Sequence, residues 1–357
     1  MGTISMKELA DALGVSTASV SVALRGKSGI SEETRSRILA EAKRCGYDMK
    51  RLRANESKGV IALLDYTYDR NFGSEKDSHL LYSQFTEAAC QAIRQNGYTP
   101  LGPLAVDDVS DVLPTDVSGF LCLGGGLYSA LTELPFEENV PFVIAGNALS
   151  HLPVTTVTHD NIYGIHEAAV HLKSLGHTRI GFVRILPGGI GQERLDAFYL
   201  ALKDLDLTAA AVVDASPEDA SFTGCEADVD ILIDRLSARI GSGPLQATAY
   251  LCDNDLAAAA FMRILRDLGK KPGEEIAVIG FDDQPFAALL EPPLTSIRTY
   301  ESELAAVCVD QLIYSITHPD TPARHIRIAT KLYCRESTLL SASDFGATKR
   351  AAPSGVS

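Results

Sequence analysis

The sequence lacks the features that would place it in a membrane or mark it for secretion. No run of about 18 apolar residues, the length that a membrane-spanning helix needs, occurs in it. The first residues, Met1 to Ser5, contain neither the basic segment nor the apolar segment of a secretion signal. We therefore expect a cytoplasmic protein with no membrane partner.

The cysteines form no recognisable pattern. None is spaced Cys-x-x-Cys, and the set is Cys45, Cys90, Cys122, Cys225, Cys252, Cys308 and Cys334. An odd, scattered set indicates neither a disulfide framework nor a zinc site, so we expect reduced and mostly buried thiols. The sequence also offers no Ser or Cys nucleophile motif. We expect no metal, no cofactor and no catalytic residues.

What is present is an ordinary globular composition with an uneven charge. The chain of 357 residues is 46% hydrophobic and 22% charged, which suits a soluble protein of two or three domains. Its net charge is −14, but residues 1–58 contain 11 Lys and Arg against 7 Asp and Glu, a balance of +4 that leaves −18 for the remainder. A basic N-terminal segment ahead of an acidic body is compatible with binding to phosphates.

Residues 5–46 have the pattern of three short helices. Ser5-Met6-Lys7-Glu8 is a capping box, and the apolar residues that continue from it at helical spacing are Met6, Leu9, Ala10 and Leu13. Gly14 can take the positive φ that follows a helix end, and Ser16 can cap a second helix over residues 17–24. A third helix is expected from Ser31 to Gly46. This arrangement predicts a helix-turn-helix, which binds duplex DNA.

The second of these helices has an outward face that suits the major groove. Its inner side is apolar, whereas its outer side is small, polar and uncharged. Short hydroxyl and methyl groups can meet base edges while cations hold phosphates. We assign base contacts to Thr17, Ala18, Ser21 and Val22, and phosphate contacts to Ser16 and Arg25. The other expected DNA contacts are Ser5, Ser31, Thr34, Lys50, Arg51 and Arg53. The alternative is a three-helix unit that only packs on the rest of the chain.

After Lys58, apolar runs alternate with helical stretches. Strands are expected at 60–64, 119–123, 142–145, 180–183, 249–252 and 276–280, and helices at 81–96, 162–175, 192–205 and 256–268. This alternation predicts an α/β fold with doubly wound parallel sheets. Ligands of such sheets bind at the carboxyl ends of strands, where Asp65-Tyr66, Asp253-Asn254-Asp255 and Asp282-Asp283 fall. Acids, amides and an aromatic ring there would suit a hydroxylated ligand.

These residues together resemble the lactose/galactose repressor family. In the headpiece the similar stretches are Ile4 to Ala10, Gly14 to Ser16, Val20-Ser21, Leu24, Ser31 to Arg35 and Gly46-Tyr47. Downstream they are His159-Asp160-Asn161, Gly176 to Ile180, Asn254-Asp255, Gly280 to Asp283, Pro292 to Thr295 and Arg335 to Thr338. Each motif alone is weak, but the set covers most of residues 3–340 and is specific in combination.

The resemblance implies a helix-turn-helix headpiece followed by a two-lobed body like that of periplasmic sugar-binding proteins, with the effector between the lobes. Expected domains are 1–58 for the headpiece and linker, 59–340 for the effector-binding and dimerisation domain, and 341–357 for a flexible tail. Lobe 1 would comprise about 59–157 and 288–322, and lobe 2 about 158–287 and 323–340. The implied effector contacts are Arg194, Asn254 and Asp282, with Tyr66 and Phe222 as weaker candidates. Alternatively, the Asp and Asn cap helices and Arg194 pairs with a local acid.

The sequence departs from the family in its linker and in its recognition helix. The family's Pro-Asn and its groove-wedging leucine are missing after Tyr47, and Glu56 lies where that leucine is expected, so the usual DNA kink is in doubt. Val22 stands where many relatives have a base-reading Arg. One rival motif, Gly124-Gly125-Gly126, could bind a phosphate, but it lacks the dinucleotide-binding spacing, and a plain turn is the better interpretation.

Two functional hypotheses follow. The first is a sequence-specific DNA-binding transcriptional regulator, a repressor, controlled by a small hydroxylated effector such as a sugar. It would act as a homodimer on a near-palindromic operator. The second is a sugar-binding protein or sugar-processing enzyme with an accessory headpiece, which would need a secretion signal or a catalytic motif respectively.

Overall fold

The computed structural model of the chain describes residues 6–24, 29–45, 47, 57–65, 78–105, 117–123, 140–146, 153–186, 188–216, 229–241 and 243–338. The expectations that lie outside these residues concern Ser5, Arg25, the linker with Lys50, Arg51 and Arg53, the residues Tyr66 and Phe222, the motif Gly124 to Gly126, and the tail. In the described part of the chain, no helix is both long enough and apolar enough to cross a membrane.

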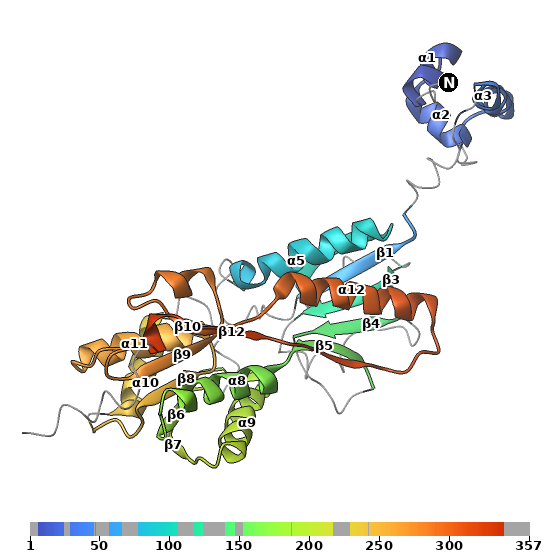
Figure 1. Ribbon diagram of the computed structural model, residues 1–357. Coiled ribbons are helices and arrows are strands. Elements are labelled where there is room, and N and C mark those ends of the chain that lie inside the picture. Colours follow the sequence, from blue (N-terminus) through green and yellow to red (C-terminus); the bar gives the residue numbers. More distant parts are fainter. Residues whose placement is uncertain are drawn as a thin grey trace, which may run out of the picture. The chain divides into compact units, whose positions relative to one another are not determined.

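The headpiece has the three expected helices, α1 (Met6–Leu13), α2 (Thr17–Leu24) and α3 (Glu32–Arg44) (Figure 1). Gly14 has a φ of 66°, which explains why α1 can turn there. The Ser16 hydroxyl accepts the backbone N–H of Ser19 at 3.0 Å and so caps α2. Ser31 caps α3 in the same way, accepting from Thr34 N at 3.2 Å. The predicted helix-turn-helix is therefore formed.

A small apolar core holds these three helices together. Its buried members are Leu9, Ala10, Val20, Ala23, Leu24, Ile38 and Ala42. Every residue of this cluster, including the partly buried ones around it, comes from the headpiece itself. The inner side of α2 is thus apolar and buried as predicted, and the residues on its other side are not part of this core.

The body contains two six-stranded sheets. The first has the order β11-β5-β4-β3-β1-β2 and the second the order β12-β10-β9-β8-β6-β7. The first sheet comprises β1 (Val60–Asp65), β2 (Thr99–Ala105), β3 (Val117–Leu123), β4 (Phe142–Ala145), β5 (Thr155–His159) and β11 (His325–Ile328). The second comprises β6 (Ile180–Arg184), β7 (Ala209–Asp214), β8 (Ala249–Cys252), β9 (Ala277–Asp282), β10 (Thr295–Arg298) and β12 (Lys331–Tyr333).

Most described strand pairs are parallel, as the alternation of strands and helices predicted. The pairs β4–β5, β6–β8 and β8–β9 are parallel, whereas β10 and β12 run antiparallel. Helices α5 (Ser78–Gln95) and α12 (Glu301–Thr317) belong to the first lobe (Figure 1). The second lobe has α8 (Asn161–Ser174), α9 (Gly188–Asp204), α10 (Val229–Ile240) and α11 (Asp255–Asp267), with the short helices η4 (Pro285–Leu289) and η5 (Glu336–Thr338).

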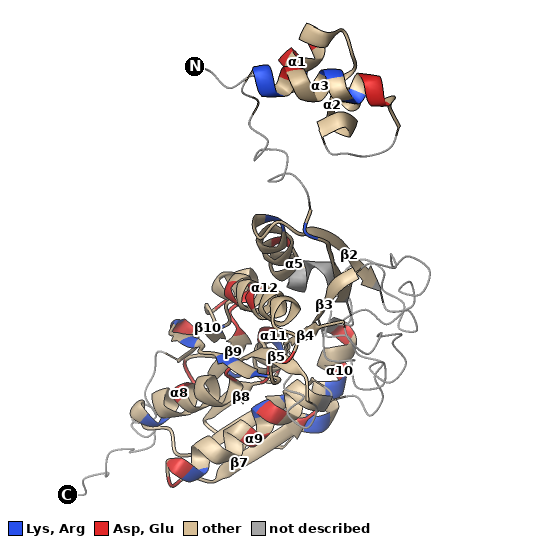
Figure 2. Ribbon diagram, turned by 90° about the vertical axis from the view of Figure 1, so that its right-hand side faces the viewer, with Lys and Arg blue, Asp and Glu red and all other residues tan. Residues whose placement is uncertain are grey.

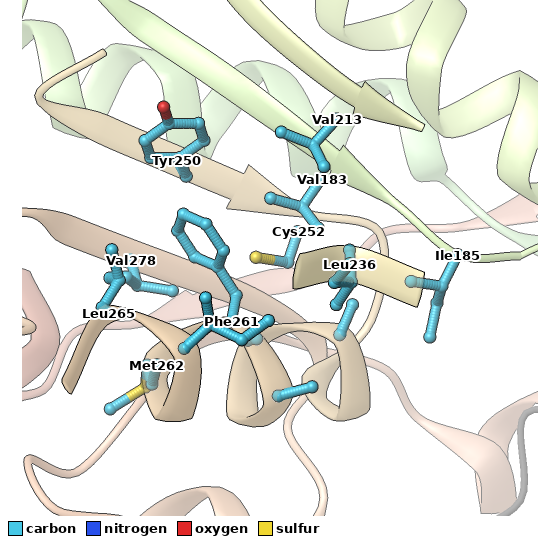
Figure 3. Packing of buried hydrophobic residues seen from close by; sticks show 14 of the residues in the cluster. Val183, Ile185, Val213, Leu236, Tyr250, Cys252, Phe261, Met262, Leu265 and Val278 are labelled. Carbon is cyan, nitrogen blue, oxygen red and sulfur yellow. The ribbon is translucent and has the colours of Figure 1, made fainter. Parts of the chain in front are cut away.

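Both faces of the second sheet are buried, because helices cover each of them. Successive residues of a strand point to opposite faces and so join different clusters. On β8, Ala249 and Leu251 join the cluster formed with α8 and α9, whereas Tyr250 and Cys252 join the cluster formed with α10 and α11. In the latter cluster the rings of Tyr250 and Phe261 lie 4.7 Å apart between centroids (Figure 3). Charged residues are found mainly on helices and at strand ends, and most of each strand is uncharged (Figure 2).

The chain passes between the two sheets three times, as expected: after β5, after β10 and after β11. The expected lobe boundaries need correction at two strands. β10 lies in the second sheet, paired with β9, although we placed 288–322 in lobe 1. β11 lies in the first sheet, paired with β5, although we placed 323–340 in lobe 2. The reason is that β10 and β11 are only four residues long, and so short a strand pairs with whichever sheet offers it a backbone partner, which its own sequence does not encode.

Candidate functional site

The predicted base-reading residues share the outer side of α2. Thr17 and Ala18 are exposed, and Ser21 and Val22 are partly exposed. These four side chains are short and uncharged, so base edges can approach the helix closely. Ser16 is exposed at the start of the helix, where its hydroxyl already accepts a backbone N–H. A phosphate at this end would also meet the positive end of the helix dipole.

Two of the other DNA-contact candidates have structural roles as well. The hydroxyl groups of Ser31 and Thr34 lie 2.8 Å apart at the start of α3. Ser31 is exposed and Thr34 is partly buried. Their first role is to cap α3, and the geometry leaves the Ser31 hydroxyl accessible to a phosphate.

In the body, Arg194 is the centre of a buried polar cluster. Its side chain extends from α9, and the residue is 6% exposed. Nε donates to Asn161 Oδ1 at 2.9 Å, Nη1 donates to the main-chain oxygen of Asp253, and Nη2 donates to Asp282 Oδ1 at 3.2 Å. The guanidinium carbon lies 3.6 Å from the centroid of the Phe281 ring, a cation–π contact. Arg194 thus connects β8, β9 and α8 at the carboxyl ends of the second sheet.

Asp282 and Asp283 take different partners, as two successive residues at a strand end should. Asp282 pairs with Arg194, whereas Asp283 forms ion pairs with Arg298 at 2.5 Å and Arg335 at 2.6 Å. Both aspartates have positive φ, 102° and 52°, which is unfavourable for a residue with a side chain. Burial raises the pKa of Asp282, and the charge of Arg194 partly offsets this. The ion pairs of Asp283 with Arg298 and Arg335 stabilise the strained turn that positions Asp282.

Asn254 and Asp253 follow β8. The Asn254 amide oxygen accepts Ala257 N at 2.7 Å, so this side chain is the cap of α11, the alternative that the sequence left open. This cap does not use the Asn254 amide nitrogen. Asp253 is fully buried, and its Oδ2 accepts the N–H groups of Ile185 and Leu186 at 2.8 and 2.7 Å. Burial raises the pKa of Asp253 to about 6, although these two hydrogen bonds act in the opposite direction.

Three further residues reach this cluster from the crossings between the lobes. His159 ends β5, and its Nε2 accepts Tyr300 N at 3.3 Å and lies 3.8 Å from Glu301 Oε1. Burial, together with the positive charge of Arg194, lowers the pKa of His159 to about 4, so this imidazole is neutral at pH 7. Asn161 begins α8 and joins Arg194 to Glu193, whose Oε2 accepts Asn161 Nδ2 at 2.7 Å.

The sequence predicted Arg194, Asn254 and Asp282, and the structure brings all three to the same edge of the second sheet. Sequence reasoning named Asp253 only within a strand-end polar motif and named His159 and Asn161 only within a motif that resembles the family. It gave no role to Glu301. The signal for His159 and Asn161 was the polar triplet His159-Asp160-Asn161 alone, because the residues before it, Thr155 to Thr158, are also mostly polar. Glu301 had no such signal, because it opens a helix, where an acid is ordinary. Groups of three or more side chains able to hold a metal ion are absent among the described residues.

The raised pKa of Glu301 predicts how the stability of the protein depends on pH. Burial, and next the charge of Asp282, raises its pKa to about 7, whereas Thr299 and Arg194 act to lower it. The folded state therefore retains a proton that the unfolded chain releases near its ordinary pKa, so this carboxyl reduces stability progressively as pH rises from about 4.5 to 7. We expect Glu301→Gln to stabilise the protein at pH 8 by about 1–3 kcal/mol and to have little effect at pH 5.

Urea denaturation of both proteins at the two pH values measures this difference. The neighbouring His159 is present in both, so its own titration largely cancels in the comparison. Glu303→Gln, an exposed acid in the same turn of α12, is the matched control and should change little at either pH. A Glu301→Gln protein that is less stable than wild type at pH 8 contradicts the assignment.

Comparison with known proteins agrees with this architecture. Residues 5–48 match the model of bacterial regulatory proteins of the lacI family, and residues 169–338 match a periplasmic binding protein-like domain. The HTH-type transcriptional regulator MalR of Streptomyces coelicolor is 27% identical over 94% of this chain and 97% of its own length. The chain belongs to the lacI family, the lactose/galactose repressor family.

Other members of the lacI family align over similar lengths. The ribose operon repressor of Haemophilus influenzae is 23% identical, over 93% of this chain and 98% of its own. A lac repressor dimer bound to operator and the anti-inducer ONPF superposes with a TM-score of 0.66 at 20% identity, covering 95% of this chain and 100% of that one. The complex of transcriptional regulator CelR with cellobiose has a TM-score of 0.62 at 23% identity, covering 94% and 99%. The two structures share the fold of this chain.

Proposed function

We propose that this lacI-family protein is a sequence-specific transcriptional repressor whose affinity for operator DNA is controlled by a small hydroxylated effector, a sugar or sugar derivative. The headpiece would bind the major groove through the outer side of α2. The effector would bind at the cluster around Arg194. The homodimer would place two headpieces on the two half-sites of a near-palindromic operator.

One observation carries this proposal: the polar cluster around Arg194 draws residues from both lobes and from two of the crossings between them. His159 and Glu301 flank the crossings, while Arg194 and Asp282 belong to the second lobe. A ligand at this position would contact both lobes at once, so it would bind one relative arrangement of the lobes better than another. Such differential affinity is what couples a ligand to a second site.

The alternative, an enzyme or plain sugar-binding protein with an accessory headpiece, is less well supported. The acids Asp253, Asp282 and Asp283 each have basic or backbone N–H partners that hold them in place. The named relatives given above are a transcriptional regulator and a repressor. Chromatography of candidate sugars after prolonged incubation with the protein would reveal turnover, which our proposal excludes.

The recognition helix can be tested by selecting binding sites from random duplex DNA. Changing Val22→Arg should alter the preferred sequence, because a guanidinium reads guanine edges that a valine cannot. Ala40→Arg, on an exposed position of α3, adds the same charge and should strengthen binding without altering the sequence selected. An identical selected sequence for wild type and Val22→Arg would show that α2 does not face the bases.

The assembly can be tested by sedimentation at micromolar concentration. We expect a dimer, both free and on its selected operator, because a single headpiece offers too small a contact area for tight specific binding. A footprint with two symmetric halves should accompany it. A monomer that still binds the selected DNA with full affinity would contradict the proposed assembly.

A further inference from the structure

The cluster around Arg194 contains more acidic than basic groups. Asp253, Asp282 and Glu301 are close enough to influence one another or to share Arg194 as an electrostatic partner. In the described part of the chain, the cationic partner of these three carboxyls is a single guanidinium, that of Arg194. A ligand bound here therefore meets an excess of negative charge.

Arg194 is poorly placed to compensate for the charge of an anionic ligand. Each of its three nitrogens already donates a hydrogen bond, to Asn161, to the main chain of Asp253 and to Asp282. One face of the guanidinium is covered by the Phe281 ring. A carboxylate or phosphate is normally bound by two parallel N–H groups of an arginine. Three of the five N–H groups of Arg194 donate in three different directions, so an anion would compete with Asn161, Asp253 and Asp282 for this side chain.

The other arginines on the surrounding elements are also paired. Arg298 and Arg335 both bind Asp283, and Arg184 lies 3.2 Å from Asp214. Arg327 lies 3.2 Å from Glu193. Binding an anion with any of these would first require breaking an existing ion pair.

The surroundings of Asp253 indicate that the ligand supplies a hydrogen-bond donor. Its Oδ1 atom is buried, and no described residue donates a hydrogen bond to it. A buried carboxylate oxygen without a donor is costly, so the site is completed by a group that can donate a hydrogen. Arg194 lies next to Asp253 and donates a hydrogen bond to its main-chain oxygen. Asn254 follows Asp253 in the chain, and its amide nitrogen is not used in capping α11. These groups suit the hydroxyl groups of a polyol.

We infer that the effector carries no phosphate or carboxylate group, and that Asp253 Oδ1 accepts a hydrogen from one of its hydroxyl groups. The inference rests on the proposed control by a hydroxylated effector and narrows it to sugars that are uncharged. It also makes Asp253 a specificity-determining residue. Its carboxylate adds a second negative charge to that of Asp282, and both charges disfavour the binding of acidic analogues of the same sugar.

Matched sugars test the charge selection directly on the full-length protein. Thermal shift at pH 7.5, followed by titration calorimetry, would compare glucose with glucuronate and glucose 6-phosphate, galactose with galacturonate and galactose 6-phosphate, and ribose with ribose 5-phosphate, with maltose and cellobiose as larger neutral sugars. A neutral sugar should bind at least about tenfold more tightly than its acidic analogues. Tighter binding of a uronate or a sugar phosphate overturns the inference while leaving the proposed function intact. Binding by no compound of the set overturns the proposed control by a sugar and the inference with it.

A variant then tests the role of Asp253. Asp253→Asn retains an amide oxygen for the N–H groups of Ile185 and Leu186, so the fold is kept, but it replaces the free acceptor with a donor. The affinity for the neutral sugar should fall about 10- to 100-fold. Asp196→Asn, the same change on an exposed position of α9, should leave it unchanged. Equal affinity of Asp253→Asn and wild type, with equal melting temperatures, overturns the assignment of Asp253.

Discussion

Replacing Arg194 with methionine should abolish the effector response of the full-length protein while its operator binding is retained. The methionine keeps much of the volume of the side chain over Phe281 but removes the three donors to Asn161, Asp253 and Asp282. Footprinting with and without the sugar that stabilises the wild type would measure the response. In the wild type the two states should differ by about 1–3 kcal/mol in operator affinity.

The same variant should also be less stable, because Asp282, whose side chain is only 24% exposed, loses its partner. Removing one member of a fully buried ion pair typically costs about 3–5 kcal/mol, and the partial exposure of Asp282 should bring the loss to the lower end of this range or below it. The double variant Arg194→Met with Asp282→Asn removes both charges and should recover most of this loss without recovering the effector response. Arg263→Met is the matched control, since its pair with Asp267 is exposed and should contribute little. Full effector response in Arg194→Met would remove this residue from the site.

Truncating one buried side chain of the headpiece, that of Leu9, should abolish operator binding. Leu9 is fully buried, and truncating such a leucine to alanine costs about 2–5 kcal/mol. A headpiece of this size has a small core and little stability in reserve. Leu9→Ala should therefore unfold the headpiece at 37 °C and abolish binding to the selected operator, which a gel-shift titration would detect.

The body should be unaffected by this change, because the core that contains Leu9 consists of headpiece residues alone. The melting transition of the body and its sugar binding should match those of the wild type. Leu39→Ala, at an exposed position of α3, is the control and should bind the operator normally. Normal operator binding by Leu9→Ala would mean that the headpiece core is more tolerant than its size implies.

The central strands and the headpiece could be predicted because each has a strong local signal. The bounds 17–24 for the recognition helix and 142–145 and 249–252 for two strands match α2, β4 and β8. In each case an apolar pattern of the right period is bounded by a polar capping or turn residue. Such signals depend only on neighbours along the chain.

Strands at the edges of the sheets, or next to an edge strand, could not be predicted in this way. β2 contains two prolines and a glycine, and β5 is a mostly polar stretch that is nevertheless buried. β11 and β12 are only four and three residues long. Their strand character comes from a partner that is distant in sequence, as the pairing of β11 with β5 illustrates. The lobe boundaries were misplaced for the same reason.

The sequence by itself determined the helix-turn-helix, the parallel α/β body and three members of the candidate site, because helix caps, apolar periodicity and strand-end polar residues are properties of contiguous residues. The tertiary structure alone decided which groups surround Arg194. Asp253, His159, Asn161 and Glu301 meet there because the crossings bring strand ends and helix starts together from positions far apart in the chain. Burial at that point shifts the pKa values of Asp253, His159 and Glu301 and so sets the balance of charge that a ligand meets. Burial in turn depends on the packing of the whole body.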